Sequence, residues 1–362
     1  MNQQPPPPPG GHTEHRLAAQ LTALGVEPGG FLLVHASLRA LGPVAGGGRT
    51  VVRALLRALG PDGTLVVPTF TAHNSDTSPA YRERVRGLGD AEVAAVRASM
   101  EPYDPLTMAS TGVGILPELV RTAPGALRSA HPQTSFAALG AHAEKVVGDH
   151  RPDCHLGEDS PLARLYDLRA RILLLGTGFD TCTAFHLGEY RVRRPPRRAY
   201  RCVVREGGVR RWWEYEDVDL TDGDFGALGG DLEREAAPGR VVTGPVGSAR
   251  ARLLGVVDAV DHARDWLERN RPRRPGPHAG AARPAWGSLA VAVGVGTVGG
   301  GTVGVGAAGV GAAGVGAAGV GAAGVGSAGV GAAGVGAVGV GAVGVGAAAT
   351  AVGVAAGVAP PG

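Results

Sequence analysis

Residues 171–191, RILLLGTGFDTCTAFHLGEYR, decide the fold class of this 362-residue chain. The run RILLLGTG (171–178) is continuously apolar at its centre, as in a strand that is buried on both faces of a sheet. A short helix is predicted directly after it, from about Thr181 to Tyr190. A doubly buried strand that leads at once into a helix is typical of an α/β protein.

The same alternation extends toward the N-terminus. Buried strands are predicted at FLLVHAS (31–37), TLVVPTF (64–70) and TSFAALG (134–140). Amphipathic helices are predicted at 15–24, 49–60, 115–122, 141–147 and 161–168, with a polar loop at 71–111. We therefore expect an α/β/α sandwich with a mostly parallel central sheet.

The pattern changes after residue 198. The stretch AYRCVVREGGVRRWWEYEDV (199–218) contains two β-like runs around Gly207 and Gly208, which is a hairpin signal. A further strand-like run at 240–256 leads into an amphipathic helix at 256–270. These segments predict an antiparallel hairpin or edge subdomain beside the main sheet.

The two ends of the chain differ from its middle. Every Lys, Arg, Asp and Glu lies before Pro284, which excludes an ordinary globular C-terminal domain. We expect a folded domain at 13–270, between a disordered Pro-rich lead at 1–12 and a Pro/Arg-rich linker at 271–287. Residues 288–362 form a Gly/Val/Ala tail with an elastin-like GVGAA repeat, which predicts disorder; self-association or adhesion is the alternative.

Charge and cysteine content limit the partners. A net charge of +3 is too small to indicate nucleic-acid binding, and an RNA-binding function would need aromatic residues among the arginines. The three cysteines form no CxxC pair, so we expect neither a disulfide framework nor a metal site. The N-terminus has no apolar signal segment and the glycine-dense tail is a poor membrane span. We expect a cytoplasmic protein without membrane partners, as a monomer or homodimer.

Common nucleotide-binding and hydrolase motifs are absent. The sequence has no GxxxxGK[ST], no complete GxGxxG, no GxSxG and no HExxH. Candidate chemistry therefore falls on polar residues at the ends of the predicted strands.

His186 and Glu189 form the sharpest candidate site. Three residues apart on a helix, they share one face, just past the carboxyl end of a strand where α/β sheets place their sites. A carboxylate there can orient an imidazole and raise its basicity, as a general base requires. Asp180 could cap this helix or add a second acidic group. The alternative is an exposed helical contact without catalytic function.

Three other segments could bind ligands. In VHASLRALGPVAGGGRT (34–50) a Gly-rich turn before a helix suits an anion such as phosphate, or is simply a tight connection. In RSAHPQTSFAALG (128–140) polar residues crowd the start of a strand, where a histidine is often structural. Loop carboxylates could converge on a polycationic ligand or remain solvated; they are Asp76, Glu101, Asp104, Glu158 and Asp159.

Taken together, these segments resemble the aminoglycoside 3-N-acetyltransferase family. The motifs that carry the resemblance occur in order over roughly residues 15–270: VHASLRALG, ALGPDGTLVVPTFT, a Tyr-Asp-Pro loop, STGVGILPE, RSAHPQTSFAALG, EDSPLARLYDL, LLLGTGFDTCTAFHLGEYR and GSARARLL. The resemblance implies acetyl transfer from acetyl-CoA, without a metal, to the 3-amino group of a 2-deoxystreptamine antibiotic, which confers resistance.

The resemblance also implies roles for individual residues. His186 of the D-x-x-T-x-x-H-x-x-E pattern would be the general base, with Glu189 as its orienting partner. Carboxylates for the drug would be Asp76, Asp104, Glu158 and Asp180. Residues for acetyl-CoA would be His35, Ser37, Arg39, Gly46, Gly47, Gly48, Thr111, Ser129, His131, Ser135 and Phe136.

Three positions depart from the family pattern. Phe185 replaces a smaller aliphatic residue, and Ala36 and Arg39 stand where small hydroxyl residues are common. The last two could alter the CoA or drug pocket. Alternatives are therefore an acetyltransferase for a biosynthetic or other small-molecule amine, and a catalytically idle member of the fold whose tail makes it an interaction protein.

Overall fold

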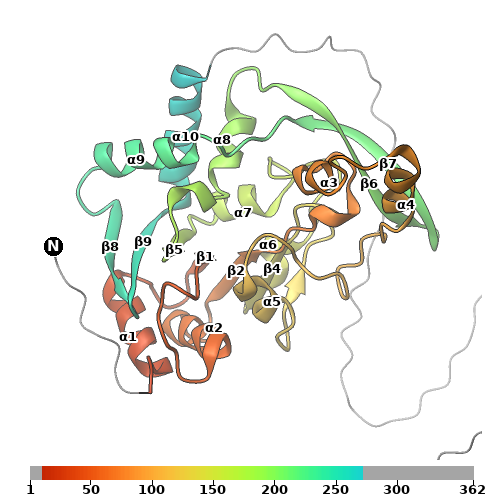
Figure 1. The fold of residues 1–362 in the computed structure, drawn as a ribbon. Coiled ribbons are helices and arrows are strands. Elements are labelled where there is room, and N and C mark those ends of the chain that lie inside the picture. The colour runs from red at the N-terminus through yellow and green to blue at the C-terminus, as the bar shows by residue number, and fades with distance from the viewer. Residues whose placement is uncertain (1–9, 272–362) are drawn as a thin grey trace, which may run out of the picture. The chain divides into compact units, whose positions relative to one another are not determined.

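Seven strands form the central sheet in residues 10–271, the part of the chain that the computed structural model describes (Figure 1). Their order across the sheet is β3-β4-β2-β1-β5-β9-β8. The strands are β1 (Phe31–Ala36), β2 (Thr64–Pro68), β3 (Leu127–Arg128), β4 (Phe136–Gly140), β5 (Arg171–Leu175), β8 (Val241–Val246) and β9 (Ala249–Gly255). All four strands predicted before residue 180 are present.

The centre of this sheet is parallel and its margins are antiparallel. β1 pairs in parallel with β2 and with β5, so that Leu32 faces Leu65 on one side and Arg171 on the other. β4 and β9 run against their neighbours, whereas β3 and β8 return to the direction of β1. Five of the seven strands thus share one direction, which confirms the mostly parallel sheet. The carboxyl ends of β1, β2 and β5 meet at one edge.

Helices cover both faces of the sheet, which confirms the sandwich (Figure 1). One core contains Leu32 and Val34 of β1, and the other contains Leu33, because successive strand residues point to opposite faces. The first core packs against α1 (Glu14–Leu24), α2 (Gly47–Leu59) and α5 (Ile115–Arg121). The second packs against α6 (Ala143–Val147), α7 (Pro161–Asp167), α8 (Phe185–Arg191), α9 (Phe225–Glu235) and α10 (Val256–Asn270).

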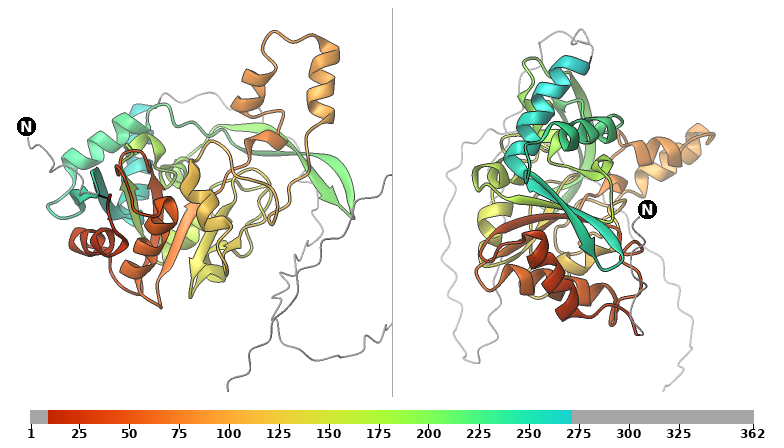
Figure 2. Two further views of the ribbon diagram at one scale, coloured as in Figure 1. Left: turned by 60° about the horizontal axis from the view of Figure 1, so that its bottom comes forward. Right: turned by 90° about the vertical axis from the view of Figure 1, so that its left-hand side faces the viewer.

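The predicted hairpin forms a separate two-stranded sheet of β6 (Arg197–Glu206) and β7 (Val209–Val218). Gly207 and Gly208 both have positive φ, +56° and +81°, which a two-residue hairpin turn of this hand requires. Figure 2 shows the hairpin projecting from the sandwich on the same side as α3 (Pro79–Arg84) and α4 (Asp90–Ala98).

The sequence predicts a polar loop at 71–111, but the structure has helices in this segment. It contains a short 3-10 helix, η1 (Ala72–Asn74), and the helices α3 and α4. Neither α3 nor α4 buries a residue, so the sequence has no apolar stripe there to indicate a helix. Local capping supports them instead: Ser78 Oγ accepts a hydrogen bond from Tyr81 N, and Glu92 accepts one from Gly89 N.

Two expected boundaries were wrong by a few residues. His12, which we assigned to the lead, is buried, donates from its backbone N to Pro43 O at 2.8 Å and bonds Ser248 Oγ through Nε2 at 3.0 Å. Arg271, which we assign to the linker from the sequence, binds the buried carboxylate of Glu189 and the partly exposed one of Asp224. The remaining lead, linker and tail, 1–9 and 272–362, lie outside the described residues.

Two further features bear on the expected partners. Within residues 10–271 no helix has both the length and the apolar content to cross a lipid bilayer. All three cysteines, Cys154, Cys182 and Cys202, are free and buried.

The contact between α8 and α10 depends on a glycine, and this can be tested. A Cβ at Gly188 would lie 2.7 Å from Ala263 Cβ and 3.0 Å from Arg264 N, with little room to move. We predict that Gly188→Ala lowers the free energy of unfolding by about 1–3 kcal/mol through overpacking, measured by urea denaturation. The control is Gly230→Ala in α9, where a Cβ meets nothing within 4 Å; it should stabilise by about 0.5–1 kcal/mol through helix propensity. Equal effects of the two changes would contradict the packing argument.

Candidate active site

The candidate site lies at the edge where β1, β2 and β5 end. Ser37 follows β1 and donates its backbone N–H to Leu175 O at 2.9 Å, which joins the two strand ends. Beyond β5 the chain forms the 3-10 helix η2 (Phe179–Thr181) and then α8. Sites of open α/β sheets form beyond the carboxyl ends of parallel strands, so the sequence motif at 180–189 is in the expected place.

His186 and Glu189 are hydrogen bonded one turn apart on α8. Nδ1 of His186 lies 2.6 Å from Oε2 of Glu189. A carboxylate only accepts, so Nδ1 carries the hydrogen and Nε2 is left as an unprotonated acceptor in the neutral ring. The imidazole also packs 4.7 Å from the ring of Phe225, and its side chain is 11% exposed. The pair is therefore largely buried, unlike the exposed helical contact that was the alternative.

Arg271 donates a hydrogen bond to the other carboxylate oxygen of Glu189. The guanidinium bonds Glu189 Oε1 through Nη1, and Oε1 also accepts from Thr221 N at 3.1 Å. The same guanidinium bonds both oxygens of Asp224, at 2.6 and 2.7 Å, and Thr221 O at 2.8 Å. The hydrogen bonds from Arg271 are the main reason that the pKa of Asp224 is lowered. Burial alone would lower the pKa of Arg271, but the two carboxylates raise it.

His35 and Thr183 lie beside His186. His35, near the end of β1, is hydrogen bonded through Nε2 to Thr183 Oγ1 at 3.3 Å. Burial, and to a lesser degree the nearby His186, lower the pKa of His35 to about 3. His35 is therefore neutral at physiological pH and cannot offer a cation to a phosphate. It can only donate or accept hydrogen bonds next to the His186–Glu189 pair.

A groove of about 1380 Å³ opens beside Glu189. It is bounded by the end of α8, the base of the β6–β7 hairpin, the segment before α9 and the end of α10. Acidic and basic side chains line it in similar number; the acidic ones are Glu189, Asp219, Asp222, Asp224, Asp265 and Glu268. The groove has room for a polar ligand of several rings beside Glu189; His186 is not among the residues that line it.

The Gly-rich turn has strict backbone requirements. Gly46 precedes α2 with φ +80°, and a Cβ at Gly48 would lie 2.4 Å from Leu119 Cδ1 and 2.8 Å from Leu38 Cδ1. These glycines therefore serve the close approach of α2 to α5 and the 36–38 turn, whatever else they do. Gly46, Gly47 and Arg39 are exposed, and Ser37, Gly48 and Thr111 are partly exposed, so all six have surface to offer a cofactor.

Four residues that we expected to contact acetyl-CoA lie in the interior instead. Ser129, His131, Ser135 and Phe136 are each at most 1% exposed. Ser129 Oγ bonds His150 Nδ1, His131 Nδ1 accepts from two backbone N–H groups, and Ser135 Oγ donates to Thr69 O. These bonds connect the 128–136 turn internally, to His150 and to Thr69 after β2, as buried polar groups require, whereas Nε2 of His131 has no hydrogen bond in the described residues. In this structure the four side chains have little surface with which to contact a cofactor.

The four carboxylates expected to bind a cationic drug fall into two groups, those with an ion-pair partner and those without one among residues 10–271. Asp76 is only 3% exposed and pairs with both Arg97, at 2.9 Å, and Arg201. Glu158 forms a two-pronged pair with Arg191, at 2.7 and 3.0 Å. Both carboxylates thus already have arginine partners, although the side chain of Glu158 is 58% exposed. Asp104 is partly exposed and Asp180 is exposed, and neither forms an ion pair with another of residues 10–271.

Several residues around the site escaped the sequence analysis. Thr183 was within the quoted motif, but its contact with His35 joins segments far apart in the chain. Thr221 and Arg271 had no signal, because their partner Glu189 is distant in sequence, and Asp224 had none, because its partner is Arg271. Asp217 of β7 accepts from His155 Nδ1 at 2.9 Å and from Tyr190 OH at 2.5 Å, and so ties the hairpin to α8.

Comparison with known proteins assigns the described region to a family. The family profile described as "Aminoglycoside 3-N-acetyltransferase" matches residues 33–268. Aminoglycoside N(3)-acetyltransferase VIII of Streptomyces fradiae is 37% identical over 292 residues, 75% of this chain and 95% of its own. The aminoglycoside N(3')-acetyltransferase-like protein YokD of Bacillus subtilis is 35% identical over 269 residues, 71% of this chain and 93% of its own.

Solved structures give the same result. The crystal structure of YokD superimposes with a TM-score of 0.67 and covers 72% of this chain and 94% of its own. A binary complex of AAC-IIIb with CoASH has a TM-score of 0.61 at 30% identity. The match covers 73% of this chain and 99% of the AAC-IIIb chain. AAC-VIa bound to sisomicin has a TM-score of 0.60 at 33% identity. The match covers 71% of this chain and 98% of the AAC-VIa chain.

The buried histidines predict how stability depends on pH. Burial lowers the pKa of His35 and of His150 to about 3, below the ordinary 6.5. Below pH 6.5 these histidines bind protons in the unfolded chain but not in the folded protein. The free energy of unfolding is therefore highest above pH 6.5 and decreases as the pH falls. We predict a loss of about 2 kcal/mol per histidine between pH 7 and pH 5, measured by urea denaturation. His35→Asn should make the dependence shallower; a constant free energy of unfolding between these pH values would contradict the prediction.

Proposed function

Because the chain belongs to the aminoglycoside 3-N-acetyltransferase family, we propose that it transfers the acetyl group of acetyl-CoA to the 3-amino group of a 2-deoxystreptamine aminoglycoside. Acetylation removes a positive charge from the drug, and the cell that carries the enzyme becomes resistant. The observation that carries the proposal is the 2.6 Å bond between His186 and Glu189 at the carboxyl edge of the parallel strands.

The geometry supports direct transfer with His186 as general base. The amine attacks the thioester carbonyl, the N–C bond forms, and the C–S bond breaks to release CoA. Nε2 of His186 accepts the proton that the amine loses, and Glu189 stabilises the resulting imidazolium through Nδ1–H. The imidazolium then returns the proton to the leaving thiolate.

An acetyl-cysteine intermediate is not supported. Cys182 is close to His186 in sequence, but it is fully buried. Burial raises the pKa of its thiol to about 12, so almost no thiolate forms at neutral pH. The amine would therefore attack acetyl-CoA itself in a ternary complex.

For acetyl-CoA, support comes from the CoASH complex of AAC-IIIb and from the surface beside α2. Gly46, Gly47 and Gly48 precede or begin this 13-residue helix, whose N-terminus is favourable for a phosphate. Ser37 and Thr111 are partly exposed nearby, at the ends of β1 and β2; Thr111 donates its backbone N–H to Phe70 O. We propose these residues, in place of the buried turn at 129–136, as the cofactor contacts.

For the drug, support comes from the sisomicin complex of AAC-VIa and from the groove beside Glu189. An aminoglycoside carries several ammonium groups and needs carboxylates that are not already neutralised. Asp180 on η2 is exposed, and Asp222 lines the groove without an ion pair to another of residues 10–271. We propose these two carboxylates as drug contacts.

The test of the function is release of thiol from acetyl-CoA by the purified protein in the presence of 2-deoxystreptamine antibiotics. NMR of the product identifies the acetylated nitrogen, and acetylation at the 3-amine is the expected result. A folded protein that binds CoA but acetylates none of these drugs would instead indicate a biosynthetic or other small-molecule amine as substrate. Failure to bind CoA would indicate the catalytically idle alternative.

His186→Ala should lower kcat by about 10²–10⁴-fold, the usual contribution of a general base, while the circular dichroism spectrum stays unchanged. The control is His142→Ala, at an exposed position whose backbone N bonds Thr64 at the opposite, amino-terminal edge of the sheet. It should leave kcat unchanged. A turnover of His186→Ala equal to that of His142→Ala would remove His186 as the base.

Arg271 should act through Glu189 rather than on the substrate amine. Arg271→Gln leaves Glu189 free to rotate, and a misplaced dyad costs about 10–100-fold in kcat. Arg271→Lys keeps one charge near both carboxylates and should recover part of the rate, measured in the same assay. Identical rates for the Gln variant and the wild type would show that Thr221 and His186 alone hold Glu189.

A further inference from the structure

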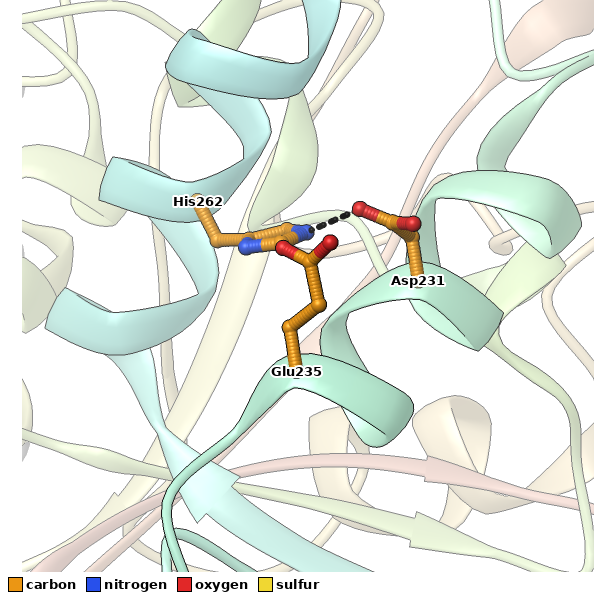
Figure 3. A group of neighbouring side chains, drawn as sticks. All are labelled: Asp231, Glu235 and His262. Carbon is orange, nitrogen blue, oxygen red and sulfur yellow. Dashed lines mark ion pairs between the residues drawn. The ribbon is translucent and has the colours of Figure 1, made fainter.

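Asp231, Glu235 and His262 meet between α9 and α10, on residues that the proposed reaction does not use (Figure 3). Asp231 and Glu235 lie four residues apart on α9 and therefore share a face. His262 of α10 points its imidazole between them (Figure 3). We propose that these three side chains bind a divalent transition-metal ion of the zinc class, which links α9 to α10.

The spacing of the ligand atoms fits tetrahedral zinc. Nε2 of His262 and Oδ2 of Asp231 lie 3.3 Å apart. Zinc bonds of ~2.0–2.1 Å to nitrogen and to oxygen, at a tetrahedral angle, separate two ligand atoms by about 3.3–3.4 Å. One ligand atom from each of the three residues falls within 4.8 Å of the others, and the exposed Glu235 can swing to complete the set. The site provides three protein ligands and leaves a fourth position for water.

The nitrogen of His262 gives independent support. Nε2 is buried and has no hydrogen bond in the described part of the chain, although it faces the carboxylate of Asp231. Nε2 forms an ion pair with Oδ2 of Asp231 but makes no hydrogen bond, so the hydrogen-bonding capacity of this buried nitrogen is not met. A metal ion at bonding distance from both atoms would satisfy it.

The donor set favours zinc over the hard cations. Imidazole nitrogen is a preferred ligand of zinc, whereas magnesium and calcium prefer oxygen ligands alone. The second oxygen of Asp231 is bonded by Arg234, which fixes the orientation of the carboxylate, as outer partners of metal ligands do. The buried cysteines cannot compete: burial raises the pKa of Cys154 and Cys182 to about 12.

The location gives such an ion a structural consequence. α9 begins after Asp224 and α10 ends before Arg271, the two residues that bond each other beside Glu189. A metal ion bound by both α9 and the middle of α10 would fix the position of one helix relative to the other. These are the helices that Asp224 precedes and Arg271 follows. The expectation of no metal rests on the absence of a CxxC pair and on the family resemblance. The sequence does not indicate this cluster, because His262 is distant in the chain from the two carboxylates.

The experiment is equilibrium zinc binding to the full-length protein, with a chelating dye as competitor and thermal unfolding as a second readout. The wild type should bind one zinc ion per chain more tightly than two variants and should melt at a higher temperature with zinc than without. His262→Ala should weaken binding by ~100-fold or more, since changes outside the ligand set already cost about 10–100-fold. Glu235→Gln, at an exposed position that cannot disturb the core, should weaken it by at least about tenfold.

The matched control is His15→Ala, which removes an exposed histidine from α1. It should bind zinc as the wild type does, which would separate the site from adventitious binding to surface histidines. The proposal is overturned if the wild type binds no zinc. It is equally overturned if His262→Ala and Glu235→Gln both retain wild-type affinity, or if His15→Ala loses the ion.

Discussion

The buried carboxylate of Glu189 constrains much of the structure around it. A charge with 3% exposure is costly unless it is paired and hydrogen bonded. Glu189 meets this requirement with partners from separate elements: His186 one turn earlier on α8, Thr221 before α9, and Arg271 after α10. Because these elements converge on one side chain, the imidazole at the proposed catalytic position has a single orientation.

Arginine–carboxylate pairs perform a similar task at the hairpin. Asp76 holds Arg201 of β6 and Arg97 of α4, and so joins the projecting hairpin to the long 71–111 segment. At the base, Asp217 accepts hydrogen bonds from His155 and Tyr190; although burial raises the pKa of Asp217, these bonds lower it overall. The hairpin therefore has a fixed position relative to α8, and its base can form one wall of the groove.

Elements were predictable from the sequence where a local pattern has one structural meaning. Continuous apolar runs identified β1, β2 and β5, Gly207 and Gly208 identified the hairpin turn, and the three-residue spacing put His186 and Glu189 on one helical face. The helices α3 and α4 were not predicted, because they have no buried stripe, and the sequence did not indicate that the polar side chains of the turn at 129–135 are buried. In this turn, the sequence does not distinguish a serine or histidine that faces a ligand from one that is buried among its neighbours.

Local sequence was sufficient to predict the α/β class, the hairpin, the family and the spacing of His186 and Glu189, because each depends on residues within one or two turns or on an ordered series of motifs. The pairing of carboxylates, in contrast, depends on the three-dimensional packing: Asp76 and Glu158 form ion pairs with arginines distant in sequence, whereas Asp180 forms none with another of residues 10–271. This packing also brings Arg271 to Glu189 and His262 to Asp231. Charge compensation depends on distances in space, and the packing of α8, α9 and α10 sets those distances.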